Sequence, residues 1–454
     1  MLRAKRIPHP LWLALLGAGL AVFLGLAWLA PAGAAGATPC VGGMAGPYPC
    51  QNIDLLGQLT LPEMGAGPET LGNDLWGWTD PLDGKEYVIY GMTDQAAFVD
   101  ISDPVNPRYL GSLPTHTTSS VYRDMQVYQN HAYIVADQPS LHGMQIFDLT
   151  ELRGVVTPTT FTETAYYGDF GNGHNLFINQ DTGFAYVMRT EQCSGAFYML
   201  DLQEPLNPAF AGCFHDDGLT SDTQCVVYAG PDADYAGREL CFTGSDDAFT
   251  VGDVTDKAAP VQLARLTYPG IERAHQGWLT EDHAYFLLSD IDDEHHNGHN
   301  TRTHLWNVAD LDAIQYMGYH EFPSPAVDHN LFIKGAYVYE ANFRNGLRIL
   351  DIFDLENGVL NEVAYFDTDP AGDSPTHNGA WSSYIWFESG TIAVSNVDQN
   401  LGLMLLQATL PGPTSASLSG LAAESNPAGF WRALALLPLL AGLLWLTGRR
   451  LKAR

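Results

Sequence analysis

The stretch HNLFIKGAYVYEANFRNGLRILD, residues 329–351, contains the pattern that decides the fold of this 454-residue chain. It reads as three short apolar strands. The first is led by His329, the second spans residues 336–339, and the third ends in Ile349 and Leu350 followed by Asp351. Short strands rich in β-branched and aromatic residues, separated by turn residues, predict an antiparallel sheet.

The same pattern recurs about every fifty residues between Asn73 and Gln407. A Pro-containing turn and a fourth strand follow the third, as in the segment that ends at Leu113. Seven units of four short strands predict an all-β fold, a seven-bladed β-propeller. Each unit begins with an aspartate or a histidine that leads its first strand: Asp74, Asp124, His174, Asp222, His275, His329 and His377.

The last unit lacks a fourth strand, because the chain enters a Pro- and Ser-rich segment after Leu406. Residues 53–60, upstream of the first unit, resemble the fourth strands elsewhere, such as 109–113. We therefore expect this N-terminal strand to complete the seventh blade and to close the ring, which would hide edges that an open sheet exposes.

The two ends of the chain resemble export and anchoring segments. Three basic residues precede an apolar run at 11–30, which is the pattern of a secretory signal peptide. Residues 430–446 are apolar apart from Arg432, and basic residues follow. They predict a single membrane span with a cytoplasmic C-terminus; the alternative is a buried core helix. The predicted organisation is a signal peptide (1–37), an N-terminal extension (38–50), the propeller (51–408), a flexible stalk (409–429), a transmembrane anchor (430–447) and a basic cytoplasmic tail (448–454).

The formal net charge is −31 at pH 7, from 52 acidic and 21 basic residues. Eight of the basic residues lie in the two terminal segments, so the predicted exported part, 31–428, has 13 basic residues and carries −39. This balance argues against a nucleic acid partner, because neutralising phosphates requires Lys and Arg. There is also no Gly-rich phosphate loop between a strand and a helix, which argues against a nucleotide.

The six cysteines favour disulfides over thiolate metal ligands, because no C-x-x-C pair occurs. Disulfides are typical of exported proteins. Of the fifteen possible pairings we expect Cys40 with Cys50, Cys193 with Cys213, and Cys225 with Cys241.

The seven residues that lead the first strands should lie near the propeller axis, as a ring of four imidazoles and three carboxylates at one mouth of the channel. Such groups are ordinary ligands of a divalent ion such as Zn, Cu, Mn or Ca, and a bound ion could orient an activated water. The alternative is that these side chains bond backbone N–H groups of the neighbouring blade.

Two further sets of candidate ligands follow the second strands. One is an acidic rim that would attract cations or basic ligands, or would simply be solvated: Asp94, Asp137, Glu191, Asp246, Asp290 and Glu340, with Asn396 in the seventh unit. The other is the loop after Asp290, which could capture a transition metal or could be merely exposed and polar. Its candidate ligands are His295, His296 and His299, with Asp292, Asp293 and Glu294.

The repeats resemble the LVIVD repeat, and the exported part is similar to the choice-of-anchor B family of bacterial surface proteins. The segments that carry this resemblance include 174–179, 224–228, 275–282 and 328–334. It implies an exported repeat domain attached to the cell surface by a C-terminus of variable type, and it implies no shared catalytic activity. Residues 410–414 depart from the LPxTG sorting signal.

These observations favour a membrane-anchored cell-surface propeller that binds an extracellular ligand or protein partner. The rival interpretation is a metal-dependent extracellular enzyme that uses the ring of His and Asp residues. Nucleophilic catalysis is not supported, because there is no G-x-S-x-G elbow and the cysteines are expected in disulfides.

Overall fold

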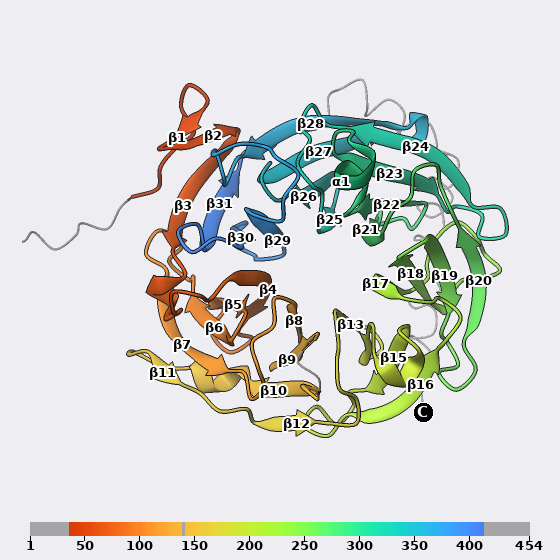
Figure 1. Ribbon diagram of the computed structural model, residues 1–454, viewed down its shortest axis with the longest axis horizontal. Helices are drawn as coiled ribbons and strands as arrows, with labels where there is room; N and C mark the ends of the chain where they lie inside the picture. Colours follow the sequence, from red (N-terminus) through yellow and green to blue (C-terminus); the bar gives the residue numbers. More distant parts are fainter. Residues whose placement is uncertain (1–35, 139–140, 413–454) are drawn as a thin grey trace, which may run out of the picture. The chain divides into compact units, whose positions relative to one another are not determined.

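The computed structural model describes residues 36–138 and 141–412, which form seven β-sheets around one axis (Figure 1). Each sheet is a blade with its first strand nearest the axis, as the repeats predicted. Blade 1 contains β4 (Gly72–Thr79), β5 (Glu86–Met92), β6 (Gln95–Asp100) and β7 (Arg108–Pro114), with β11 (Thr159–Thr160) added in parallel to β7. Blade 2 contains β8 (Arg123–Tyr128), β9 (His131–Ala136), β10 (Met144–Asp148) and β12 (Ala165–Tyr167). Blade 3 contains β13 (Leu176–Asn179), β14 (Phe184–Val187), β15 (Phe197–Asp201) and β16 (Ala209–Phe214).

The next three blades follow the same order. Blade 4 contains β17 (Thr220–Val227), β18 (Glu239–Ser245), β19 (Ala248–Asp253) and β20 (Val261–Leu266). Blade 5 contains β21 (Ala274–Leu279), β22 (Tyr285–Asp290), β23 (Arg302–Asn307) and β24 (Gln315–Glu321). Blade 6 contains β25 (Leu331–Lys334), β26 (Tyr337–Ala341), β27 (Leu347–Asp354) and β28 (Val359–Phe366), extended by β2 (Tyr48–Gln51) and β1 (Met44–Ala45). The helices are short: α1 (Asp293–Asn297), η1 (Pro62–Met64), η2 (Leu149–Leu152), η3 (Glu191–Cys193) and η4 (Leu355–Asn357).

The ring closes as predicted. Blade 7 takes three strands from the C-terminal side and one from the N-terminal side: β29 (Ala380–Tyr384), β30 (Ile392–Asn396), β31 (Leu403–Ala408) and β3 (Ile53–Leu59). β3 is antiparallel to β31, with Ile53 opposite Ala408 and Leu59 opposite Leu403. The preceding residues were expected to be only an extension, but β2 pairs with the outer strand of blade 6, so the N-terminal segment binds two neighbouring blades.

Polar side chains link one inner strand to the next. The backbone N–H of Leu176 donates to Asp124 at 2.6 Å, and that of Leu331 donates to Gln276 at 2.7 Å. In the following layer the N–H of Ile178 donates to Gln126 at 2.9 Å. These bonds satisfy backbone groups that the narrow ring removes from water.

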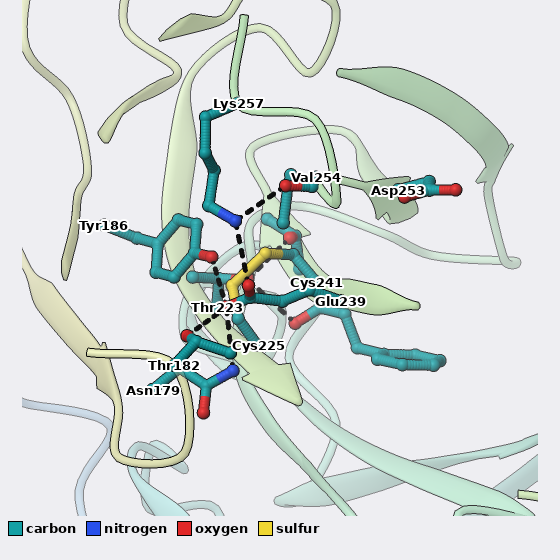
Figure 2. Close-up of a disulfide and its surroundings, with 12 residues drawn as sticks. Asn179, Thr182, Tyr186, Thr223, Cys225, Glu239, Cys241, Asp253, Val254 and Lys257 are labelled. Atoms are coloured by element: carbon teal, nitrogen blue, oxygen red, sulfur yellow. Dashed lines mark hydrogen bonds and ion pairs between the residues drawn. A yellow bond between two sulfur atoms is a disulfide. The ribbon is translucent and has the colours of Figure 1, made fainter. Parts of the chain in front are cut away.

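All three expected disulfides are present, between Cys40 and Cys50, Cys193 and Cys213, and Cys225 and Cys241. The last joins neighbouring strands of blade 4 (Figure 2). Three disulfides indicate an oxidising, extracytoplasmic environment.

A buried ion pair lies close to this disulfide (Figure 2). The ammonium of Lys257 donates to Glu239 at 2.8 Å. The other carboxylate oxygen of Glu239 accepts hydrogen bonds from Asn179, Thr182 and Tyr186 of blade 3. Because every oxygen has a partner, this buried charge is compensated and joins two blades.

Among the helices in the described ranges, none is long and apolar enough to cross a membrane. The predicted membrane span at 430–447 and most of the predicted signal peptide lie outside those ranges.

Candidate metal centre

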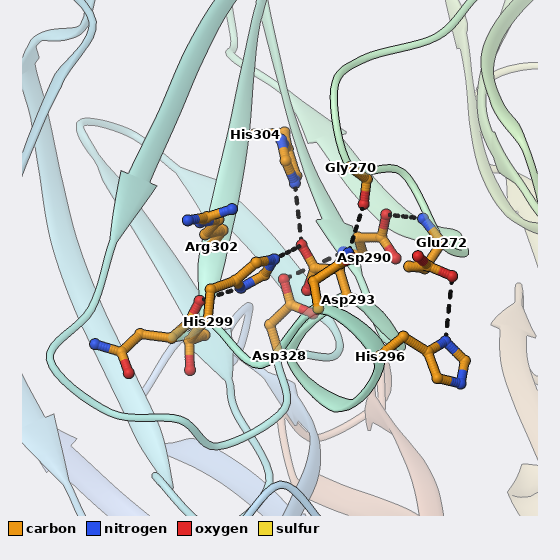
Figure 3. A network of polar contacts seen from close by, with 12 residues as sticks. Gly270, Glu272, Asp290, Asp293, His296, His299, Arg302, His304 and Asp328 are labelled. Carbon is orange, nitrogen blue, oxygen red and sulfur yellow. Dashed lines mark hydrogen bonds and ion pairs between the residues drawn. The ribbon is translucent and has the colours of Figure 1, made fainter.

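The densest group of possible metal ligands lies in blade 5, at the turn from β22 to β23 (Figure 3). β22 ends at Asp290, and Asp293 and Glu294 open the one-turn helix α1 directly after it. Gly298 ends α1 with a φ of 71°, a left-handed conformation that glycine adopts without strain, so the chain returns towards β23. His299 follows this turn, and His304 lies within β23.

The ligand atoms of three of these residues, Asp290, Asp293 and His304, all lie within 4.8 Å of one another. The Nε2 atoms of His299 and His304 are 3.2 Å and 3.6 Å from Oδ2 of Asp293. Two ligands on a tetrahedral ion at ordinary zinc–ligand distances are about 3.3 Å apart. The two separations from Asp293 therefore match neighbouring ligands of one ion. For His299 the alternative is an ion pair with Asp293.

Neighbouring groups hold these ligands in place. Nδ1 of His299 donates to the backbone carbonyl of Asn300 at 2.8 Å, which in a neutral ring leaves a lone pair on Nε2. Nδ1 of His304 lies 2.9 Å from the hydroxyl of Tyr316. Asp290 accepts a hydrogen bond from the hydroxyl of Tyr268 at 2.8 Å, in addition to two backbone N–H groups.

Several of the inward atoms have no partner. Asp293, Glu294, His304 and Asp328 are at most 2% exposed. Within the described ranges, no hydrogen bond reaches Oδ1 of Asp293, either carboxylate oxygen of Glu294, or Oδ1 of Asp328, and no Lys or Arg forms an ion pair with any of these acids. Leaving such groups unpaired in the interior costs several kcal/mol.

The raised pKa values of the buried carboxyls show the same lack of nearby positive charge. Burial raises the pKa of Asp293 to about 6. Burial and the charge of Asp293 raise the pKa of Glu294 to about 10. Burial, followed by the charges of Glu294, Asp293 and Asp290, holds the pKa of Asp328 well above its usual value. A divalent cation among them would favour the ionised carboxylates.

His304 is already in the protonation state that a metal requires, because burial lowers its pKa to about 4 and leaves the ring neutral near pH 7. Mixed imidazole and carboxylate ligands suit an ion such as Zn²⁺ or Mn²⁺. Asp290, Asp293 and His304 are almost fully buried, as in a closed structural site, whereas a catalytic ion keeps a position open to substrate.

The structure divides the loop that the sequence singled out. His299, Asp293 and Glu294 lie in the cluster, whereas His295 is exposed and His296 points away towards Glu272 (Figure 3). Asp292 pairs instead with Arg273 at 3.0 Å.

Sequence reasoning missed His304 and Asp328. His304 reads as an ordinary strand residue, and Asp328 comes just before a histidine that had already been assigned to the ring. The only signal was their position, because the strand that contains His304 and the approach to β25 both border the loop.

The three aspartates of the predicted ring share one small cavity on the axis. Asp74, Asp124 and Asp222 line a space of about 20 Å³ together with Gln276 and Asn330. Burial raises the pKa of Asp74 to about 6. Burial also raises the pKa values of the other two carboxyls well above normal, and the charge of Asp74 adds to both shifts.

The four histidines of the ring do not line this cavity. In His275-Gln276 and His329-Asn330 it is the second residue that lines it, so the histidines belong to an adjacent layer. The rings of His275 and His329 lie 4.4 Å apart, and Nδ1 of His174 is 2.9 Å from Asp137. The remaining ring residue, His377, packs against an aromatic side chain, Phe343.

Burial lowers the pKa values of the ring histidines, that of His329 to about 3. Metal binding by the ring stays a prediction, while Asp124 makes the backbone bond that was its alternative.

The acidic rim holds neighbouring loops together. Asp94 accepts from Thr70, Glu191 from Asn172, and Asp246 pairs with Arg189. Glu340 is 1% exposed and accepts a hydrogen bond from Thr303 of blade 5; burial raises its pKa to about 7. In the seventh unit the hydroxyl of Tyr90 donates a hydrogen bond to the backbone carbonyl of Asn396 at 2.6 Å.

Comparison with known proteins identifies one repeat of the chain. Residues 329–362 match the LVIVD repeat, which includes the stretch from which the fold was predicted. No curated protein matches the chain by sequence.

Solved structures are similar at low identity. A protein from Lactobacillus plantarum is 13% identical, with a TM-score of 0.47, covering 75% of this chain and 96% of that one. A functionally unknown protein from Desulfotomaculum acetoxidans is 9% identical, with a TM-score of 0.48, covering 72% and 90%. A computationally designed protein is 9% identical, with a TM-score of 0.46, covering 74% and 83%.

Proposed function

We propose that this chain is an exported β-propeller that serves as a binding platform at the cell surface, and that a divalent metal ion in blade 5 stabilises one end of its channel. The observation that carries the metal is the group of buried, unpaired ligand atoms around Asp293. A cation there would compensate the clustered carboxylates and would fix the turn that connects β22 with β23.

The closed surroundings of the centre support a structural ion in a binding protein over a metalloenzyme. A catalytic ion would need an open coordination position, but His304, Asp293 and Glu294 are almost fully buried. The second candidate function is a metal-dependent enzyme that uses the ring of His and Asp residues to bind its metal.

The attachment of the platform is also part of the proposal. The three disulfides support export, and the LVIVD repeat supports the resemblance to the choice-of-anchor B family. The predicted signal peptide and the apolar segment at 430–447 would place the propeller outside the cytoplasmic membrane with a single-pass anchor.

Metal analysis of the purified full-length protein tests the centre. After chelation, dialysis and addition of Zn²⁺ or Mn²⁺, we expect about one ion per chain. Asp293→Asn and His304→Ala should abolish this ion, whereas His296→Ala, in the same loop but outside the cluster, should retain it. Loss of the ion in His329→Ala with retention in His304→Ala would instead locate the metal in the ring.

Ligand binding and turnover separate the two candidate functions. A binding platform should retain its partner in His174→Ala and His329→Ala. An enzyme of the ring should lose both its metal and its turnover in these variants.

A further inference from the structure

A large cavity lies at the end of the channel opposite to the metal centre. It has a volume of about 680 Å³ and is lined where the inner strands end, for example at Thr79, Asn179 and Val227. Asp290 of the metal centre instead pairs with Ala274, where an inner strand begins. A volume of this size is typical of small-molecule sites.

Tryptophans from three blades form the apolar wall of this cavity. Trp76 and Trp278 come from inner strands, and Trp386 follows the inner strand of blade 7. The ring centroid of Trp386 lies 5.7 Å from that of Trp76 and 5.6 Å from that of Trp278. Phe332 packs edge-on against all three. The indoles stay partly exposed, so a continuous aromatic surface faces the cavity.

This packing decides between two kinds of ligand that bind to aromatic surfaces. A site for a quaternary ammonium group surrounds the cation with separate rings. Here Trp386 packs against both Trp76 and Trp278, so the three indoles form one patch instead of separate walls around a cation. They present an apolar platform, which suits the C–H face of a sugar ring.

The charges of the lining fit an uncharged ligand. Among the described residues that line the cavity there is no Lys or Arg, and Asp181 provides the one carboxylate. Burial lowers the pKa of His283, the one lining imidazole, which is therefore neutral near pH 7. Nothing in the lining attracts an anion.

The polar atoms of the lining suit hydroxyl groups. Oε1 of Gln126 accepts the backbone N–H of Ile178, which leaves its Nε2 to donate. Nε2 of Gln180 donates to the carbonyl of Val127 at 2.9 Å, which leaves its Oε1 to accept. A sugar hydroxyl both donates and accepts, so these two fixed amides can serve neighbouring hydroxyls.

We infer that this aromatic cavity binds a neutral carbohydrate, stacked on the three tryptophans and held by the amides of Gln126 and Gln180. The inference deepens the proposed binding platform, on which it rests, by naming its ligand class. The cavity and the metal centre can be tested on the same samples, because they lie at opposite ends of the channel.

The test is a titration of the full-length, metal-loaded protein with cellotetraose, maltotetraose and chitotetraose, followed by tryptophan fluorescence and calorimetry. Tetramethylammonium is titrated in parallel. We expect saturable binding of at least one oligosaccharide, and an affinity at least about tenfold weaker in Trp386→Ala. Trp381→Ala, which changes a tryptophan packed on His329 near the other end, is the matched control and should bind as the native protein does.

Three results would overturn the inference: no saturable binding of any oligosaccharide, unchanged binding in Trp386→Ala, or tighter binding of tetramethylammonium than of every sugar. If Trp386→Ala does not fold, Gln180→Ala changes an exposed side chain and should weaken binding several-fold. A protein that takes up no ion after metal is added but binds sugar would refute the metal centre alone. A protein that takes up the ion but binds no sugar would refute the carbohydrate site alone.

Discussion

A single carboxyl group, that of Asp74, shows how the narrow channel changes the chemistry of its residues. Its Oδ1 accepts the N–H of Leu75 and its Oδ2 accepts the amide of Asn330, yet no cation lies beside it among the described residues. Burial therefore outweighs the hydrogen bonds and raises the pKa to about 6. The folded protein binds this proton more tightly than the unfolded chain does.

Asp74→Asn should consequently change the pH dependence of stability. A carboxyl whose folded pKa is raised contributes stability below its unfolded pKa of 3.8, and that contribution is lost as the pH rises through about 6. Above pH 6 the ionised carboxylate of Asp74 lowers the free energy of unfolding of the wild type by roughly 3 kcal/mol. The neutral amide of Asp74→Asn does not have this cost. We expect the variant to be more stable at pH 8 and equal to the wild type at pH 4.

Urea unfolding between pH 4 and 8 in the presence of a chelator measures this effect. The amide of an asparagine at position 74 has a partner available, because Oδ1 of Asn330 is unpaired. Asp181→Asn, an exposed carboxylate, is the control and should change little at any pH. If Asp74→Asn is less stable than the wild type at pH 8 in chelator, ionised Asp74 does not destabilise the folded protein.

At the scale of elements, the closing strand β3 depends on one glycine. A Cβ atom at Gly57 would lie 2.3 Å from the carbonyl oxygen of Pro104, in the turn of blade 1. The β3–β31 ladder also shifts register at this position. Only a residue without a side chain allows the outer strand of blade 7 to approach its neighbour so closely.

Gly57→Ala should therefore destabilise the protein by about 1–3 kcal/mol, because the strand or the turn must move to relieve the overlap. Urea unfolding gives the free energy, and limited proteolysis detects release of the N-terminal segment. Gly67→Ala is the comparison, since the nearest atom to a Cβ there is 3.6 Å away. Equal stability of the two variants would show that the ring does not depend on this close approach.

At the scale of the molecule, two features connect distant parts of the ring. The N-terminal residues join blades 6 and 7 through β2 and β3, and the metal centre includes Asp328, in the segment that leads into blade 6. A ligand that binds only the folded state stabilises the whole cooperative unit, by about 2.7 kcal/mol at a hundred times its dissociation constant.

We therefore expect chelation to lower the midpoint of thermal unfolding and added metal to restore it. His304→Ala should melt at the same temperature with and without metal, whereas His296→Ala should respond as the wild type does. Differential scanning calorimetry measures both. An equal response of His304→Ala and the wild type would place the stabilising ion elsewhere.

The fold was predictable from the sequence because its evidence is repeated. Seven copies of one strand pattern identify seven blades, and a missing fourth strand together with a matching segment at 53–60 identifies the closure. The disulfide between Cys225 and Cys241 followed in the same way, because the two cysteines fall on neighbouring strands of one unit. Each of these inferences depends on the order of residues along a strand, which local sequence records.

The functional sites depended on the tertiary structure. The repeat placed aspartate and histidine at equivalent positions, but the inner strands have register shifts, for example between Ala274 and Gly277. A slip of one residue exchanges the side chain that faces the axis, so Gln276 lines the cavity instead of His275.

The sequence also did not show which side chains of the loop come together. His299 and His304 converge on Asp293, while His295 and His296 remain outside the cluster. The sequence by itself determined the ring and its closure, because these follow from strand order. Only the tertiary structure decided which side chains come together, because that depends on bulges and turns.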